Sequence, residues 1–247
     1  MILSGCGKDT VTIDLPEDVP SDATSGAETA VPEEPEPQEA PEEFSVGVIA
    51  SLSDAGSLKV GLEPLTVTDA DSDGVLTVCD AIWCLHERFF PGGAGKGFAT
   101  ERMQEGPAIS LFWGEDNGGF YSWTVDGRQG KSLLEPLGEG SELYAFSYSD
   151  IPLCLDGFGA IEGSVTEAED GTTGYEGVLT CTDAGGETFP VAGAMILIDG
   201  IARGGVATDQ QGRFFVPLEK QGSHLITAVS ADIPMIPPVC RFDFTVG

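Results

Sequence analysis

The sequence predicts an α+β protein in which one helix lies on a mixed sheet and a small antiparallel β-sandwich follows. The 247 residues include 34 Gly and 16 Pro, which favour turns and short strands. From Phe44 onward, short apolar segments alternate with clusters of Gly, Asp and Pro, and one stretch has apolar residues at helical spacing. These observations disfavour an all-helical bundle. They also divide the chain into four parts: 1–6, 7–43, 44–168 and 169–247.

Residues 1–6 are interpreted as a truncated signal segment. They end in Leu-Ser-Gly-Cys, which resembles a bacterial lipobox, the motif in which a cysteine becomes lipid-modified. The resemblance implies that Cys6 is lipidated and that the membrane is a partner through this lipid. The charged start and most of the apolar part of a secretory signal are missing from these residues, so a chance match in a cytosolic protein is the alternative.

Residues 7–43 predict a disordered acidic tether. They contain twelve acidic residues, six prolines and one lysine, and they include the run PEEPEPQEAPEE. Such a segment cannot bury enough apolar surface to offset the entropy lost on ordering, and its charge repulsion and prolines keep it extended. A lipidated cysteine before an extended spacer is typical of a bacterial cell-surface lipoprotein with extracellular domains. An acidic tail without an anchor is the alternative.

The first folded region, 44–168, is predicted to contain six strands. Apolar residues alternate with polar ones in each of these segments, which are 44–50, 57–63, 64–69, 108–114, 120–127 and 142–149. Gly, Asp and Pro clusters separate them, as expected for turns. One helix among several strands predicts a helix packed on a sheet.

That helix is predicted over residues 77–90. Thr77 and Asp80 have the spacing of a capping box, in which each side chain bonds the other residue's backbone N–H. Four apolar residues then recur at helical spacing: Val78, Ile82, Leu85 and Phe89. We interpret this apolar stripe as part of the core, with a binding face as the alternative.

The second folded region, 169–247, is predicted to be all β. Six apolar segments lie between turn-forming residues, at 176–182, 189–199, 202–209, 212–218, 223–230 and 239–246. No helical pattern interrupts them, which favours a small antiparallel sandwich. The boundary with the first region falls within 151–172, and we place it after residue 168.

Residues 69–80 fit the loop of an EF-hand. Aspartates stand at positions one, three and five, Gly74 stands at position six, and an acidic residue closes the loop at position twelve. Ca²⁺ takes about six to eight oxygen ligands, and this spacing lets alternate residues converge on one ion. The predicted ligands of a structural Ca²⁺ are Asp69, Asp71, Asp73, Val75 through its carbonyl, Thr77 through a water molecule, and Asp80.

An aspartate rather than a glutamate at position twelve makes this loop resemble dockerin-type loops. Mg²⁺ suits it less well, because that ion keeps its waters and demands stricter geometry. The alternative interpretation is an acidic surface turn that only caps the helix. Three aspartates packed so closely would repel one another without a cation, which favours the calcium interpretation.

The charge balance excludes some partners. There are 41 Asp and Glu residues against 11 Lys and Arg, which gives a formal net charge of -30. Nucleic-acid binding is disfavoured because phosphate contacts need clustered cations. An anionic membrane surface would also repel this chain, so membrane attachment has to be covalent or hydrophobic.

The titratable residues show no catalytic arrangement, so we expect a protein that is not an enzyme and has no catalytic residues. No Ser-His-Asp spacing or nucleophile elbow occurs, and we assign both histidines packing or surface roles. Beyond residue 6 the cysteines are Cys79, Cys84, Cys154, Cys181 and Cys240. Their pairing stays open, because the last two can form a disulfide or remain buried thiols.

Aromatic residues concentrate in 112–123, around the probable turn at Gly118 and Gly119. Alternation along a strand places Tyr121 on one face and its neighbours on the other. We expect most of these rings to fill core and the remainder to line a shallow ligand surface.

Residues 67–149 resemble the transcobalamin-like C-terminal domain of bacterial surface proteins, a β-grasp-like module. The resemblance rests on the aspartate loop, on Phe112-Trp113-Gly114, on 119–127, and on Pro136-Leu137 with the following glycine. It implies a helix on a mixed β-grasp-like sheet and a corrinoid ligand such as cobalamin. In animal carriers this module acts with a large helical domain, a pattern absent from these 247 residues. The predicted ligand-binding residues are Trp113, Tyr121, Trp123, Pro136 and Leu137.

Residues 190–231 resemble the carboxypeptidase regulatory-like, or collagen-adhesin B-type, sandwich. The matching segments are 191–194, 208–209, 212–214 and 222–228. Such domains usually act as spacers or stalks without chemistry of their own.

Together these features predict a non-enzymatic, surface-anchored lipoprotein that presents a calcium-stabilised ligand- or partner-binding domain. The alternatives are capture of cobalamin or a related corrinoid, and adhesion to a host protein or glycan.

Overall fold

A computed structural model describes residues 44–245 with the exception of 105, 117 and 152. All described elements belong to one compact unit, Glu42–Gly247. The expected lipidated Cys6 and the expected tether of 7–43 lie outside the described residues. Within the described part of the chain, no helix has the length and apolar character needed to cross a membrane.

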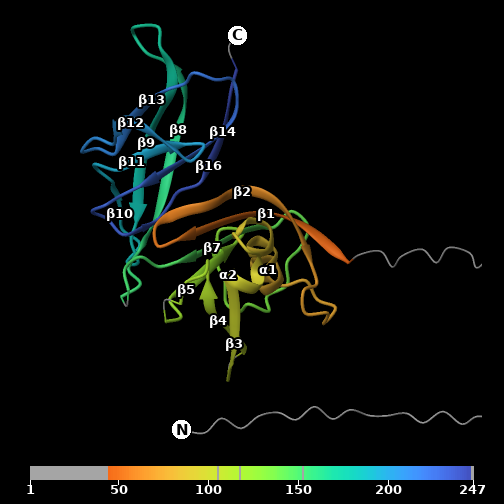
Figure 1. The fold of residues 1–247 in the computed structure, drawn as a ribbon. Helices are drawn as coiled ribbons and strands as arrows, with labels where there is room; N and C mark the ends of the chain where they lie inside the picture. The colour runs from red at the N-terminus through yellow and green to blue at the C-terminus, as the bar shows by residue number, and fades with distance from the viewer. Residues whose placement is uncertain (1–43, 105, 117, 152, 246–247) are drawn as a thin grey trace, which may run out of the picture. The chain divides into compact units, whose positions relative to one another are not determined.

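The fold is mostly β, with 53% of the described residues in strands and 8% in helices, and the strands form several sheets (Figure 1). This confirms the coarse prediction of a strand-rich protein with little helix. The elements before residue 150 are β1 (Ser45–Asp54), β2 (Ser57–Thr68), α1 (Val78–Phe89), α2 (Ala94–Gly97), β3 (Phe98–Met103), β4 (Gly106–Phe112), β5 (Tyr121–Val125), β6 (Arg128–Gln129) and β7 (Glu142–Ser147).

These first strands form a mixed five-stranded sheet and a separate hairpin. The sheet has the order β2-β1-β7-β5-β6, and β1 pairs with β7 in parallel while the other neighbours are antiparallel. The hairpin consists of β3 and β4 alone. Helix α1 contacts β2, and the apolar side chains of both enter one core with those of β1 and β7. The sheet therefore holds α1 and the loop before it in place.

Helix α1 begins as the sequence predicts. Thr77 is the N-cap, its side chain accepts the Asp80 N–H at 3.4 Å, and an Asp80 oxygen accepts the Thr77 N–H at 2.9 Å. This reciprocal pair satisfies two backbone donors that a helix start leaves unpaired. Val78, Ile82 and Leu85 are fully buried, so the apolar stripe is core. The short helix α2 was not expected from the sequence.

The remaining strands surround a second core. They are β8 (Gly157–Glu167), β9 (Thr173–Thr182), β10 (Thr188–Pro190), β11 (Met195–Ile198), β12 (Ile201–Ala207), β13 (Arg213–Pro217), β14 (Gly222–Val229), β15 (Met235–Ile236) and β16 (Cys240–Phe244). One sheet has the order β10-β9-β8-β15 with β13 also on β9, and the other has the order β12-β11-β14-β16. Apolar residues from both sheets form one buried cluster. The short β8–β15 pair is parallel, so the strands are not all antiparallel as expected.

The second group of strands starts earlier than the sequence suggests. Strand β8 pairs with β9 over ten residue pairs, so it belongs to the second group although it precedes residue 168. Its start at Gly157 lies within the range 151–172 expected for the boundary.

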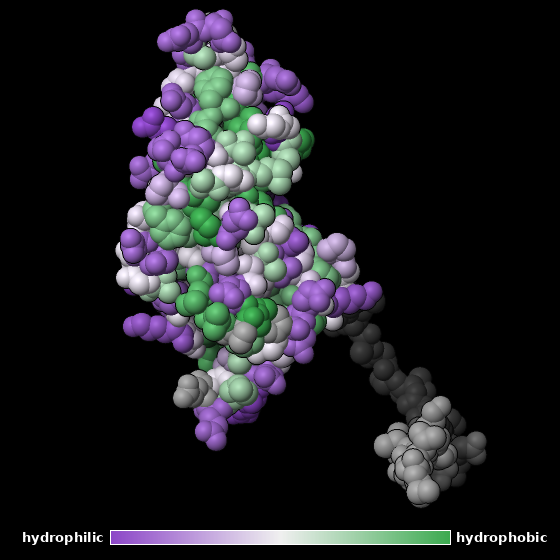
Figure 2. All heavy atoms as spheres, turned by 90° about the vertical axis from the view of Figure 1, so that its left-hand side faces the viewer, coloured by the Kyte–Doolittle hydropathy of each residue, from purple (hydrophilic) through white to green (hydrophobic). Residues whose placement is uncertain are grey.

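The surface mixes apolar and hydrophilic residues, and Figure 2 shows apolar patches between hydrophilic ones on one face.

Candidate metal loop and aromatic cavity

The aspartate loop brings three carboxylates together. One oxygen from each of Asp69, Asp71 and Asp73 lies within 4.8 Å of the other two. Asp69 is half-buried and the other two side chains are exposed. Hard divalent cations are bound by such groups of carboxylate oxygens. The geometry can hold one metal ion, and it does not by itself distinguish calcium from another cation.

Backbone hydrogen bonds fix the loop around Asp69. Its two oxygens accept the Asp73 N–H at 3.2 Å and the Gly74 N–H at 2.8 Å. Gly74 has a φ of 83°, a left-handed conformation that favours glycine. The Gly74 N–H and its neighbours hold the pKa of Asp69 below its ordinary value. The loop is thus wound around an ionised carboxylate.

Asp71 is in the opposite electrostatic situation. Partial desolvation and repulsion from the carboxylates of Asp73 and Asp80 raise the pKa of Asp71 above its ordinary value. A cation among these oxygens would reverse the repulsion, because opposite charge favours the ionised form.

Asp80 and Thr77, the other expected side-chain ligands, serve the start of α1. Asp80 is only 3% exposed. One of its oxygens accepts the Ala70 N–H at 3.0 Å, and the other accepts the Thr77 N–H and the Thr77 hydroxyl, the latter at 2.6 Å. The three-carboxylate group does not include Asp80, so ligation by Asp80 or Thr77 stays a prediction. Val75, whose carbonyl was the other expected ligand, donates its N–H to Asp73 at 2.8 Å.

A distant segment fastens the loop and the helix start. Leu76, at loop position eight, is buried, and its carbonyl accepts the Leu137 N–H at 2.9 Å. The carbonyls of Leu133 and Glu135 accept the first two N–H groups of α1 at 2.8 and 3.0 Å. The connection between β6 and β7 therefore caps the helix from outside. Sequence reasoning missed this contact because more than fifty residues separate the partners.

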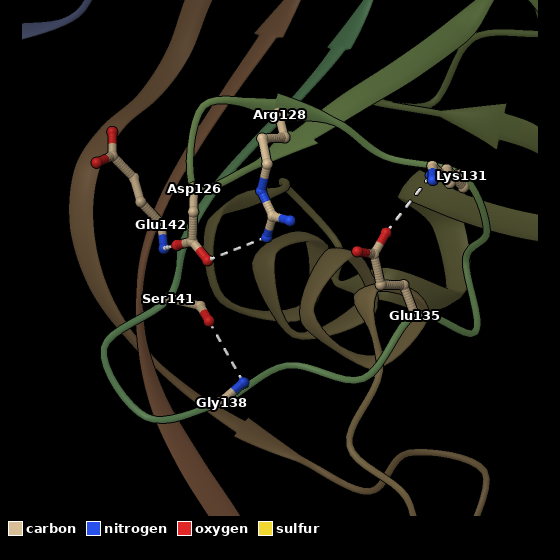
Figure 3. Close-up of polar contacts among 7 residues, drawn as sticks. All are labelled: Asp126, Arg128, Lys131, Glu135, Gly138, Ser141 and Glu142. Atoms are coloured by element: carbon tan, nitrogen blue, oxygen red, sulfur yellow. Dashed lines mark hydrogen bonds and ion pairs between the residues drawn. The ribbon is translucent and has the colours of Figure 1, made fainter.

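Figure 3 shows how this connection is itself held. At its ends, Asp126 accepts the Glu142 N–H at 2.9 Å and lies 4.0 Å from the guanidinium of Arg128. Within it, Glu135 accepts the Lys131 N–H at 3.4 Å, and Ser141 accepts the Gly138 N–H at 3.3 Å. These local bonds shape the segment that meets the metal loop.

A cavity of about 540 Å³ lies between β4 and β5, and we call it the aromatic cavity. Tyr121 and Trp123 line it together with Glu101, Asp116 and Leu133. The Tyr121 hydroxyl donates to the Glu115 carbonyl at 3.0 Å, which fixes the ring's orientation. Trp123 and Leu133 also line an adjoining cavity of about 550 Å³. The volume of the aromatic cavity is within the usual range of small-molecule sites.

The expected ligand face is only partly assembled. Tyr121 and Trp123 share the aromatic cavity, as predicted for residues two apart on a strand. Trp113 packs instead on His86 and Phe90, with ring centroids 5.5 and 5.3 Å away. Of the pair Pro136 and Leu137, the second is buried and the first is exposed beside Thr77.

Both histidines are held by hydrogen bonds within the fold. His86 is fully buried, and its Nε2 accepts the Trp113 N–H at 3.0 Å, so Nδ1 donates to the Ile82 carbonyl at 2.7 Å. Burial lowers the pKa of His86 to about 4, which keeps the ring neutral. His224 lies between Asp199 and the Lys220 carbonyl, each 2.8 Å from one ring nitrogen.

The sequence left the pairing of the cysteines open, and the structure shows the following four as free thiols. Cys181 and Cys240 are free, and so are Cys79 and Cys84 on α1. Burial, together with the carboxylates of Asp80 and Asp71, raises the pKa of Cys79 to about 11. A thiol with such a high pKa is a poor nucleophile at neutral pH.

Comparisons with models of known protein families, with curated proteins and with solved structures gave no match for this chain. The domain resemblances drawn from the sequence therefore stay predictions.

Proposed function

We propose that this protein is a non-enzymatic, surface-anchored lipoprotein that presents a calcium-stabilised ligand-binding domain. The observation that carries the proposal is the convergence of the Asp69, Asp71 and Asp73 carboxylates at the start of α1. Calcium is favoured over magnesium because Ca²⁺ accepts irregular groups of carboxylate and carbonyl oxygens, whereas Mg²⁺ demands near-ideal octahedral geometry.

The loop's position explains how calcium would stabilise the fold. Residues 69–77 connect the end of β2 to the start of α1, two elements that share one core. An ion bound to the folded loop and not to the unfolded chain raises the free energy of unfolding by mass action. The bonds from Leu133, Glu135 and Leu137 would pass that effect to the connection that lines the aromatic cavity.

The finer fold assignment belongs to the same proposal. A mixed sheet with one main helix supports a β-grasp-like first domain, and two sheets around one core support a sandwich of the carboxypeptidase regulatory-like kind. The aromatic cavity favours ligand binding by the first domain. Corrinoid capture and adhesion to a host protein or glycan are two specific forms of that function.

Thermal unfolding of the full chain tests the calcium proposal. Millimolar calcium should raise Tm relative to the same sample in chelator, and Asp71→Asn/Asp73→Asn should lose that rise. The matched control is Glu162→Gln/Glu219→Gln, which removes the same charge from exposed positions far along the chain. The control should keep the rise. Equal curves with calcium and chelator for the unmodified chain would refute calcium stabilisation.

Surface anchoring is tested through Cys6. Expressed in a bacterium behind a complete lipoprotein signal, the chain should fractionate with membranes and carry a lipid mass on Cys6. A Cys6→Ala variant should move to the soluble fraction. Equal membrane association of both proteins would contradict the proposed anchor.

A further inference from the structure

The charged residues described in the lining of the aromatic cavity are both acidic. Its lining includes two acidic residues, Glu101 from β3 and Asp116 from the segment after β4. Among the described residues that line it, none is Lys, Arg or His. Lys131 lines the adjoining cavity, which shares Trp123 and Leu133 with the aromatic cavity. A concave site with one sign of charge concentrates ligands of the opposite sign, and the net charge of -30 acts in the same direction.

Two aromatic rings lie in the same cavity. One face of Tyr121 packs on Phe112, at a centroid distance of 5.4 Å, and its hydroxyl is held by the Glu115 carbonyl. The backbone of Trp123 is held by the Gly130 N–H, which donates to the Trp123 carbonyl at 2.9 Å, and Gly130 lies close against the indole, since a Cβ there would be 1.8 Å from the indole nitrogen. Tryptophan and tyrosine faces attract organic cations through the ring quadrupole. These rings are pre-positioned, so binding does not have to order them.

Part of the remaining lining is apolar, and part is polar, because Ser110, Gly118 and Gly119 also line the cavity. Met103, Ile109 and Leu133 line the cavity, and Leu133 is almost completely buried. Such walls favour an alkyl or ring substituent over a small hydrated ion, because burying apolar surface is favourable. Carboxylates, aromatic faces and apolar walls together describe a receptor for an apolar cation.

We propose that the aromatic cavity binds an organic ammonium ion with an apolar substituent. The ammonium head is stabilised by Glu101, Asp116 and the rings of Tyr121 and Trp123, and the substituent occupies the apolar part. This inference deepens the proposed function, on which it rests, by naming the ligand class of the domain that the lipoprotein presents.

Titration of the full chain with three hexyl compounds tests the assignment. Hexyltrimethylammonium is the cationic probe, 1-hexanol the neutral one and hexyl sulfate the anionic one, all below micelle formation. Calorimetry should show saturable binding of the ammonium compound, with hexanol about tenfold weaker or more, as one ion–aromatic and one ion–carboxylate contact would give. Hexyl sulfate should not bind.

Variants locate the site. Glu101→Gln/Asp116→Asn should weaken ammonium binding about tenfold or more, since it removes both charges and keeps the side-chain shapes. Glu162→Gln/Glu219→Gln changes the net charge equally and should leave binding unchanged. Ammonium binding should also change the tryptophan fluorescence, and Trp123→Phe should abolish that change, because neither of the other tryptophans, Trp83 and Trp113, lines the cavity.

The outcomes separate this inference from the calcium proposal. Absence of saturable ammonium binding, equal binding of hexanol, or equal weakening by both double variants would each overturn the assignment. A calcium-dependent rise in Tm without ammonium binding overturns only the ligand class. Ammonium binding without that rise overturns calcium stabilisation and leaves the cavity assignment standing.

Discussion

Within the metal loop, the fold disfavours the negative charge of Asp71. Desolvation and the neighbouring carboxylates of Asp73 and Asp80 raise its pKa. In chelator, Asp71→Asn should therefore raise the free energy of unfolding slightly, by about 0.5 kcal/mol or less, because exposed charges interact weakly. The side-chain amide oxygen that Asp71→Asn introduces can still accept the Asp73 N–H, as the Asp71 carboxylate does. Urea unfolding in chelator measures this, and a clear loss of stability would show that the carboxylate repulsion is not significant.

The raised pKa of His224 leads us to predict that the free energy of unfolding falls in mild alkali. Its hydrogen bond to Asp199 is the main cause that raises its pKa above the ordinary value of 6.5. Both ring nitrogens face acceptors, so the folded state favours the doubly protonated ring. Arg203 is the opposing cation. This stabilisation is complete below pH 6.5 and is lost as pH rises through the elevated pKa.

Urea unfolding of the full chain from about pH 6 to about pH 8 measures this dependence, because thiols with a raised pKa, such as Cys79, add a loss of the same sign at higher pH. The unmodified chain should lose stability over the range, and His224→Gln should flatten the curve. The buried His86 cannot produce the same trend, because its pKa is lowered to about 4 and its charging destabilises the fold only on acidification. An identical slope for both proteins would remove His224 from the explanation.

At the scale of the element, the connection between β6 and β7 depends on glycine where it passes Trp123. A Cβ on Gly130 would lie 1.8 Å from the Trp123 indole nitrogen, so Gly130→Ala must displace the ring or the backbone. We expect a loss of about 1–3 kcal/mol in the free energy of unfolding, as for other overpacked sites. Weaker ligand binding in the aromatic cavity should accompany it.

Gly138→Ala is the matched control on the same connection. A Cβ there meets only the Ser141 hydroxyl oxygen, at 3.9 Å, and the N–H bond to that oxygen can remain. Its stability and binding should stay close to those of the unmodified chain. If both substitutions proved equally harmless, Trp123 would not be held against this connection.

Local features of the sequence predict local elements well. The capping box of Thr77 and Asp80, the buried stripe of α1 and the glycine turn at Gly74 depend on spacings of a few residues. The convergence of the aspartate carboxylates follows from the same short loop. By contrast, the external cap supplied by the 133–137 segment joins parts of the chain that only the folded sheet brings together.

Four strands escaped prediction, β3, β6, β8 and β15, and for the two longer ones, β3 and β8, the structure shows a physical reason. In β3, every residue after Phe98 is exposed, because the strand pairs only with β4, so the sequence shows no alternation. In β8, glycines replace apolar residues where neighbours approach closely; a Cβ on Gly163 would lie 2.2 Å from the Glu176 carbonyl oxygen. Trp113 was assigned to the ligand face because sequence cannot show that it packs on His86.

At the scale of the whole molecule, composition predicts the fold class better than it predicts the boundary between the two groups of strands. Abundant Gly and Pro and the scarcity of helical patterns agree with a fold that is mostly strand. The boundary between the two groups of strands depends on the pairing of β8 with β9, which composition does not reveal. The net charge of -30 also makes every cation stabilise the chain to some degree by screening.

Calorimetric titration of the chelator-treated full chain with calcium is the most direct test of the central claim, and the same titration with magnesium controls for screening. We predict saturable binding near one calcium ion per chain, weaker binding of magnesium, and loss of the calcium signal in Asp71→Asn/Asp73→Asn. The Glu162→Gln/Glu219→Gln control should bind as the unmodified chain does. No saturable calcium signal, or a signal that the loop variant retains, would contradict a calcium site at residues 69–80.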